Sequence, residues 1–190
     1  VKNGSYQKND VFTWFGEPFT ELAGKTWGII GLGAIGRKVA DIAKAFGAHV
    51  IYYSASGRPV QEGYEQVDLN TLLRTSDVIS VHAPLNEYTE NLMDKAAFAK
   101  MKRSAIFLNL GRGPIVVEED LAEALKQGTI AAAGVDVLRT EPIQPDNPLL
   151  AIKDSHKLFI TPHIAWASTE ARTRLMQIVL DHVKDFVETR

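Results

Sequence analysis

The sequence predicts an α/β protein built on a doubly wound parallel sheet, with helices on both faces of the sheet. Short apolar runs alternate along the chain with stretches whose apolar residues recur at helical spacing. This alternation indicates parallel strands joined by right-handed helical crossovers. A glycine-rich turn follows the first strand, and polar side chains follow several later strands. Open α/β sheets bind ligands at such strand ends, so both observations favour the same fold.

The expected strands are short apolar runs at residues 26–30, 50–53, 78–81, 105–109, 132–137 and 158–160. Three amphipathic helices are expected between and after them. The first ends at Gly47 and the second at Gly128, because glycine commonly follows a helix. Their apolar faces are formed by Ile35, Val39, Ile42, Ala43 and Phe46; by Leu121, Ala124 and Leu125; and, near the C-terminus, by Leu175, Ile178, Val179, Val183 and Phe186.

The composition is that of an ordinary water-soluble domain. The chain has 190 residues, 45% of them hydrophobic and 23% charged, and a net charge of −2. This charge and the scattered basic residues give no reason to expect a nucleic acid or a membrane as partner. The absence of cysteine excludes disulfides, thiolate metal sites and cysteine nucleophiles, and we expect no metal site. There is no signal peptide and no apolar run of the roughly 20 residues that span a bilayer, so we expect a cytoplasmic protein.

The segment GIIGLGAIG places Gly31, Gly33 and Gly36 at the spacing G-x-G-x-x-G. Ordinary glycine-rich turns share this spacing, but here a strand precedes it and an amphipathic helix begins within it. Gly31 permits the tight turn, Gly33 lets a pyrophosphate approach the backbone, and Gly36 lets the helix pack on the strand. Free N–H groups at the helix start, around Ala34 and Ile35, favour the negative charge. The sequence therefore predicts a Rossmann dinucleotide-binding domain.

The position that contacts the adenosine ribose lies about 20 residues after the glycines in this fold and usually carries an acid. Here it is Ser54, and no acidic residue occurs from His49 to Gln61. A carboxylate would repel the 2′-phosphate of NADP, so its absence admits either NAD or NADP. Two interpretations are open. Ser54, Ser56 and Arg58 hydrogen-bond the 2′-phosphate, or the loop simply accepts both cofactors.

Chemically active side chains follow three later strands. Arg112 follows one of them, Asp136 and Glu141 follow the next, and His163 follows the last. A lone histidine after an apolar strand is more often a satisfied structural residue. Because the carboxyl ends of parallel strands meet at one edge of the sheet, these basic, acidic and imidazole groups are expected to converge there. The grouping favours a catalytic role for His163.

Longer motifs occur in the order GKTWGIIGLGAIGRKVA, VHAPLNEYTENLM, LNLGRGPIVVEEDLAEAL, GVDVLRTEP and TPHIAWAS. From about Leu22 to the C-terminus, the chain resembles the D-isomer-specific 2-hydroxyacid dehydrogenase family. HIAW most resembles its glycerate dehydrogenase or hydroxypyruvate reductase branch. The resemblance implies an oxidoreductase that interconverts a D-2-hydroxy acid and a 2-keto acid with NAD or NADP. Glycerate, hydroxypyruvate or glyoxylate is the expected substrate. The alternative is a non-catalytic NAD(H)-sensing dimerisation module, similar to the related corepressors.

The resemblance also implies a role for each site residue. Arg112 would bind the substrate carboxylate and polarise the keto oxygen, which suits a planar guanidinium. His163 would be the general acid in reduction and the base in oxidation, with Glu141 bonded to its far ring nitrogen. Asp136 would hold the nicotinamide carboxamide. Trp166 either shapes the substrate pocket or packs against the last helix.

Further cofactor-binding positions follow from the same resemblance, and one feature departs from it. Backbone segments of the nicotinamide ribose site would be His82, Ala83 and Pro84, together with Leu110 and Gly111. Thr89, His163 and Ala165 also match positions beside the cofactor, Thr89 without an assigned role. The family often carries an arginine between the second and third glycines, where this chain has Ala34-Ile35, so pyrophosphate binding would rest on backbone groups.

The expected organisation is an arm at residues 1–24, a dinucleotide-binding domain at 25–167 and a C-terminal interdomain helix at 168–190. The arm is expected to pack against something, such as the partner in a homodimer, because a disordered tail rarely carries Phe12, Trp14, Phe15 and Phe19 together. Full members of the family begin with a substrate domain, which we expect to be absent from this chain. Their catalytic cleft closes between two domains, so we expect little or no turnover from this chain alone.

Overall fold

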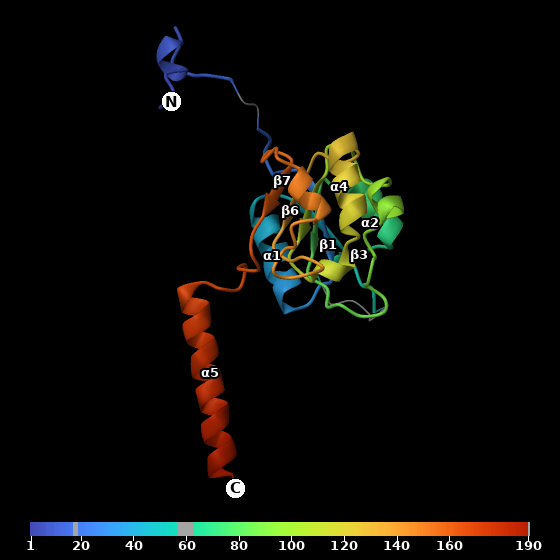
Figure 1. Ribbon diagram of the computed structural model, residues 1–190, viewed down its shortest axis with the longest axis vertical. Coiled ribbons are helices and arrows are strands. Elements are labelled where there is room, and N and C mark those ends of the chain that lie inside the picture. The colour runs from blue at the N-terminus through green and yellow to red at the C-terminus, as the bar shows by residue number, and fades with distance from the viewer. Residues whose placement is uncertain (17–18, 57–62, 190) are drawn as a thin grey trace.

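A parallel sheet forms the centre of the structure (Figure 1). The computed structural model describes residues 1–16, 19–56 and 63–189, and within these the seven strands lie in the order β3-β2-β1-β4-β5-β6-β7. Every neighbouring pair is parallel, which confirms the predicted fold class. The strands are β1 (Thr26–Ile30), β2 (His49–Tyr53), β3 (Glu65–Gln66), β4 (Val78–Val81), β5 (Ile106–Asn109), β6 (Ala132–Val135) and β7 (Leu158–Ile160).

Five α-helices accompany this sheet in the described part of the chain: α1 (Ala34–Ala45), α2 (Leu69–Thr75), α3 (Lys95–Phe98), α4 (Glu118–Gln127) and α5 (Thr169–Glu188). Short 3-10 turns occur at η1 (Tyr6–Lys8), η2 (Gly113–Ile115) and η3 (Pro148–Ala151). Side-chain oxygens of Asp68, Asp94 and Ser168 cap the starts of α2, α3 and α5 by accepting backbone N–H groups. Gly128 ends α4 in the left-handed conformation, as its position in the sequence indicates.

Consecutive residues of a strand face opposite sides of the sheet, and β1 shows this with Ile29 and Ile30. Ile29 packs in the cluster that contains Ala40 and Ala43 of α1. Ile30 packs in the larger cluster on the other face, where α2, α3 and α4 contribute Leu72, Leu73, Phe98, Leu121 and Leu125. Helices therefore cover both faces, and each strand holds its end in a fixed place between two packed layers.

Helix α1 buries a different face from the one that its large apolar residues suggest. Ala40 and Ala43 are buried against the sheet, whereas Ile35, Ile42 and Phe46 are 69%, 58% and 63% exposed. The small alanines let the helix axis approach the sheet closely. Val39 packs beside them, whereas the three larger residues lie on the outer side. The apolar face predicted for the last helix is not buried either, because α5 has no buried residue.

The arm and α5 both extend away from the sheet domain (Figure 1). Phe12 and Phe19 of the arm are 91% and 93% exposed, and its 3-10 turn η1 buries no residue. The packed role predicted for residues 1–24 stays a prediction. Within the described residues, no helix combines the length and the apolar character that crossing a membrane requires.

The chain reverses its direction of travel across the sheet between β1 and β4. From β1 it adds β2 and β3 on one side, then returns to place β4 to β7 on the other. The carboxyl ends of β1 and β4 are adjacent, since Ile30 is paired with Val81. This point, where neighbouring loops diverge, is where open α/β sheets bind ligands.

Candidate active site and dinucleotide cleft

Two of the three motif glycines are required by the backbone that surrounds them. Gly31 has φ +93°, and a Cβ atom there would lie 2.6 Å from the backbone nitrogen of Ala83. A Cβ atom on Gly36 would lie 2.3 Å from the carbonyl oxygen of Gly31. Gly33 is different, because a Cβ atom there would meet nothing within 4 Å. The space above Gly33 is therefore open for a ligand to approach the backbone at the start of α1.

A cleft of about 420 Å³ lies at this point of the sheet. Its wall contains Gly31 and Gly33 from the glycine turn, Ser54 and Ser56 from the end of β2, and His82, Ala83 and Pro84 from the end of β4. These predicted cofactor-binding residues are thus brought together. Ala34 and Ile35 begin α1 beside the cleft, while Arg58 lies outside the described residues.

Arg37, which the sequence did not indicate as a cofactor-binding residue, also lines the cleft. Its Nε atom is shielded from solvent and has no hydrogen-bond partner among the described residues. Arg37 directly follows the last motif glycine, and the lack of an arginine at Ala34 could have prompted a search for another cation nearby.

Two residues shape the wall formed by the loop after β4. The hydroxyl of Thr89 is buried, donates to the carbonyl oxygen of Pro84 at 2.7 Å and accepts from the backbone nitrogen of Asn86 at 2.9 Å. Thr89 therefore braces the loop that carries the cleft residues. Burial lowers the pKa of His82, whose Nε2 lies 3.1 Å from the hydroxyl of Ser80, and its Nδ1 is shielded without a partner.

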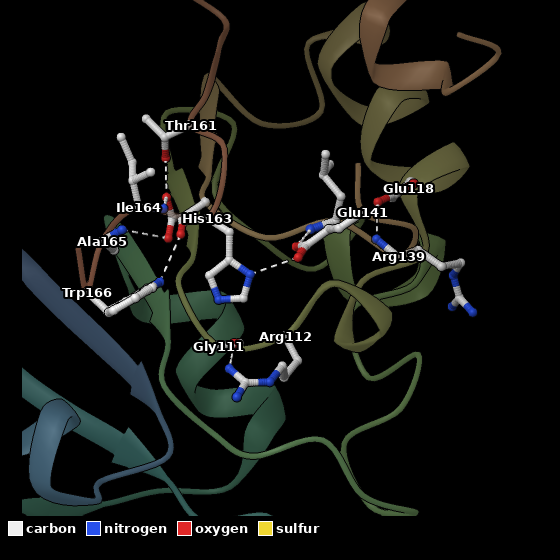
Figure 2. A network of polar contacts seen from close by, with 12 residues as sticks. Gly111, Arg112, Glu118, Arg139, Glu141, Thr161, His163, Ile164, Ala165 and Trp166 are labelled. Carbon is white, nitrogen blue, oxygen red and sulfur yellow. Dashed lines mark hydrogen bonds and ion pairs between the residues drawn. The ribbon is translucent and has the colours of Figure 1, made fainter. Parts of the chain in front are cut away.

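The catalytic residues predicted after β6 and β7 are in direct contact. Nδ1 of His163 lies 2.7 Å from Oε2 of Glu141, and the two side chains are 39% and 37% exposed. The other carboxylate oxygen of Glu141 accepts the backbone N–H of Leu138 at 2.8 Å. This second bond fixes the carboxylate, so the imidazole ring is held with Nε2 directed away from Glu141 (Figure 2).

The electrostatics of Glu141 favour its ionised form. Partial burial acts to raise the pKa of this carboxyl, but hydrogen bonds from His163 and Leu138 and the charges of His163 and Arg112 lower it overall. Because the Arg112 charge helps to lower the pKa of Glu141, its guanidinium lies close enough to act on the His163–Glu141 pair (Figure 2). A basic group, an imidazole and a carboxylate therefore meet at one sheet edge, as the sequence predicts.

Asp136 anchors the turn that carries His163. Its carboxylate is buried and accepts three hydrogen bonds, from the hydroxyl of Thr161 at 2.5 Å and from the backbone nitrogens of Ile164 and Ala165, each at 2.9 Å. The backbone carbonyl of Asp136 accepts the N–H of His163 at 2.8 Å. Burial acts to raise the pKa of this carboxyl, and the three hydrogen bonds outweigh that effect and lower it.

The structure gives Asp136, Ala165 and Trp166 roles within the protein that the sequence did not indicate. Asp136 and Ala165 bond to each other, and the indole of Trp166 donates to the carbonyl oxygen of His163 at 3.0 Å. Thr161, another contributor to this turn, was missed by the sequence analysis. His163 itself has φ +53°, a conformation that costs energy in a non-glycine residue and is concentrated at functional sites.

Arg112 is exposed, and its guanidinium donates to the carbonyl oxygen of Gly111 at 2.8 Å. Leu110 is 40% exposed, and Gly111 packs so closely on the loop after β4 that a Cβ atom would lie 2.9 Å from the carbonyl oxygen of Ala83. Leu110 and Gly111 do not line the cleft of the glycine turn.

A separate pocket of about 510 Å³ borders Asp136, Glu141 and His163.

Comparisons with known proteins agree with this geometry. Residues 2–165 match the family model described as D-isomer specific 2-hydroxyacid dehydrogenase, NAD binding domain. The chain is 45% identical over 190 residues to a hydroxypyruvate reductase of Blautia hydrogenotrophica, covering 99% of this chain. It is 43% identical over 187 residues to a glycerate dehydrogenase of Methylorubrum extorquens, covering 98% of this chain. The chain spans 58% of the length of each of these relatives.

A solved structure also resembles this one closely. The structure of an acyclic imino acid reductase in complex with NADPH and D-Arg matches it with a TM-score of 0.83 and 33% sequence identity. The likeness covers 99% of this chain and 59% of that chain. The fold is therefore shared with a protein whose solved structure is a complex with NADPH.

Proposed function

The chain belongs to the D-isomer-specific 2-hydroxyacid dehydrogenase family, and we propose that the whole protein interconverts a D-2-hydroxy acid and a 2-keto acid by hydride transfer. The observation that carries this proposal is the His163–Glu141 contact of 2.7 Å beside Arg112, at the same sheet edge as the glycine-turn cleft. Proton transfer and hydride transfer to one carbonyl group require these parts together.

The residues present fit a nicotinamide dinucleotide. The open backbone at Gly33 and the start of α1 suit a pyrophosphate, and the end of β2 suits the adenosine ribose. His82, Ala83 and Pro84, which line the cleft at the end of β4, suit the ribose of the nicotinamide half. When bound, the dinucleotide supplies the hydride that the protein's own side chains lack.

Each catalytic side chain has one task in the reduction of a 2-keto acid. The Arg112 guanidinium binds the substrate carboxylate and polarises the keto oxygen. As the carbonyl carbon gains a hydride, the oxygen takes a proton from Nε2 of His163 and becomes a hydroxyl. Glu141 stabilises the protonated ring and fixes its orientation. In the oxidation direction, neutral His163 removes the hydroxyl proton.

We place the substrate among small polar 2-keto acids, with hydroxypyruvate or glyoxylate and their reduced products as the first compounds to test. The named relatives, a hydroxypyruvate reductase and a glycerate dehydrogenase, support this choice. The exposure of His163 and Glu141 supports a further expectation for the 190-residue chain. With its dyad open to water, this chain alone turns over little or no substrate.

A second copy of the chain is the partner that we propose for the domain. Ile35, Ile42 and Phe46 form an exposed apolar stripe on α1, and the arm exposes further aromatic rings. Apolar patches of this kind mark protein interfaces more often than free surface. Sedimentation over a concentration series tests the homodimer, and a chain that stays monomeric at high concentration contradicts it.

The experiment for the proposed function has two parts. Calorimetric titration of the chain with NADH and NADPH tests the cleft, and binding of at least one is expected. Steady-state assays of the full-length protein with hydroxypyruvate and glyoxylate then test the chemistry. A His163→Gln variant should lose about 10²–10⁴ in kcat while still binding the dinucleotide. Dinucleotide binding without turnover in the full-length protein would instead support a sensor.

A further inference from the structure

We propose that Arg37, together with Ser54 and Ser56, binds the adenosine 2′-phosphate of NADPH and makes the protein prefer NADPH over NADH. This inference rests on the proposed function, because it concerns the same dinucleotide cleft. It assigns a specificity role to a side chain that the glycine motif does not include.

The Arg37 side chain lies in an environment that suits an anionic ligand. The residue lines the cleft, and its Nε atom is shielded from solvent without a hydrogen-bond partner in the described part of the chain. Within the described residues, the guanidinium forms no hydrogen bond and no ion pair. A shielded guanidinium nitrogen without a partner is costly unless a ligand satisfies it, and an anion in the cleft would do so.

The natural intramolecular partner of Arg37 is already engaged. Asp41 lies four residues further along α1, at the spacing that favours an ion pair on a helix. The hydroxyl of Tyr64 donates instead to the Asp41 carboxylate. The ring of Tyr64 is covered by the ammonium group of Lys44, 3.9 Å from the ring centroid. Arg37 is thus left to face the cleft with its positive charge unpaired.

The end of β2 provides two hydroxyl groups to the same cleft. Ser54 and Ser56 line the cleft, and their hydroxyl oxygens lie 3.3 Å apart. Both hydroxyls can turn from each other toward an anion. No acidic residue from His49 to Gln61 opposes a negative ligand there. One cation and two hydroxyls form a donor set suited to a phosphate monoester.

The position of Arg37 favours the 2′-phosphate over the pyrophosphate. Arg37 is the fourth residue of α1, and its backbone N–H is used within the helix, donating to the carbonyl oxygen of Gly33 at 3.0 Å. Tyr52 of β2, two residues before Ser54, also lines the cleft. The pyrophosphate instead suits the helix start at Gly33, where free N–H groups are available without any side chain.

The test compares NADPH and NADH affinities by calorimetry at one ionic strength, for the 190-residue chain and three variants. Arg37→Met removes the charge and keeps an apolar stem. Lys38→Met is the matched control, because Lys38 is exposed on the same helix and does not line the cleft. Ser54→Asp places a carboxylate at the proposed phosphate site. Competition by 2′,5′-ADP and 5′-AMP on the unmodified chain isolates the 2′-phosphate from the nicotinamide half.

We expect the unmodified chain to bind NADPH at least about tenfold more tightly than NADH, and 2′,5′-ADP more tightly than 5′-AMP. Arg37→Met should weaken NADPH binding by about tenfold or more and change NADH binding little. Lys38→Met should change neither affinity. Ser54→Asp should reverse the preference. If Arg37→Met fails to fold, the Ser54→Asp and competition results still decide whether the cleft binds the 2′-phosphate.

Two results would overturn the inference and leave the proposed function intact. One is equal loss of NADH and NADPH in Arg37→Met, which would assign Arg37 to the pyrophosphate. The other is tighter NADH than NADPH binding by the unmodified chain. If the unmodified chain binds neither dinucleotide, the inference and the proposed use of this cleft fail together.

Discussion

The imidazole of His163 and the carboxylate of Glu141 meet at 2.7 Å, although they come from loops after different strands. Leu138 fixes one oxygen of Glu141, and Asp136 fixes the backbone of the His163 turn. The contact therefore depends on two separate anchors. These anchors and the glycine turn lead to four predictions.

Glu141→Gln should lower kcat of the full-length protein by at least about tenfold and leave dinucleotide affinity nearly unchanged. The amide oxygen can still accept from Leu138, but an NH2 group then faces Nδ1 of His163 and cannot stabilise the protonated ring. Steady-state kinetics over a range of pH measure this effect. An unchanged kcat and pH profile would show that Glu141 has no part in proton transfer.

Asp136→Asn should destabilise the chain by about 1–3 kcal/mol. The carboxylate accepts from Thr161, Ile164 and Ala165, and an amide NH2 would face one of these donors without an acceptor. Denaturant unfolding measures the loss. Thr161→Val, which removes only one of the three donors, is the matched control and should cost less. Equal stability of Asp136→Asn and the parent chain would contradict the anchoring role.

Stability should fall on acidification because the pKa of Asp136 is lower in the folded chain than its ordinary value of 3.8. A carboxyl with a depressed folded pKa stabilises the fold above its unfolded pKa, and this contribution disappears as the pH falls through the folded pKa. The loss from Asp136 therefore belongs below pH 3.8. Glu141, whose pKa is lowered from 4.5, adds a loss that begins below pH 4.5. Unfolding midpoints measured between about pH 2 and 6 should show a weaker dependence in Asp136→Asn than in the parent. Parallel curves would contradict the assignment.

Gly33→Ala and Gly31→Ala should separate binding from stability. A Cβ atom at Gly33 meets nothing within 4 Å, so stability should stay within about 0.5 kcal/mol of the parent, while dinucleotide affinity falls about tenfold or more because the pyrophosphate approaches there. Gly31→Ala should lose about 1–3 kcal/mol because of its φ of +93° and the contact with Ala83. Thermal unfolding and calorimetry make the comparison, and unchanged affinity in Gly33→Ala would place the pyrophosphate elsewhere.

The sequence was sufficient to predict the parallel sheet and the strand ends that carry Arg112, Glu141 and His163. Apolar runs mark buried strands, and the loops after parallel strands share one edge. It did not indicate β3, since Glu65 and Gln66 are two exposed polar residues without a strand pattern. It also misled about α1, where Ala40 and Ala43 face the sheet and Ile35, Ile42 and Phe46 face outward.

The site was predicted less completely than the fold. Arg37 was missed because one arginine in an amphipathic helix has no sequence signature, and only the geometry of β2 and α1 brings it beside Ser54. The sequence also could not indicate that the Asp136 carboxylate accepts hydrogen bonds from backbone N–H groups, because almost any residue type can provide such a donor. Side-chain patterns reveal which groups share a sheet edge, whereas anchoring contacts depend on loop conformation.

The most direct measurement of the central claim is the oxidation of NADPH and NADH by the full-length protein in the presence of hydroxypyruvate, followed by chiral analysis of the product. We predict cofactor oxidation that depends on hydroxypyruvate, formation of D-glycerate and loss of turnover in His163→Gln. Cofactor binding without oxidation for any small 2-keto acid, or turnover that survives in His163→Gln, would contradict the assignment of a 2-hydroxyacid dehydrogenase.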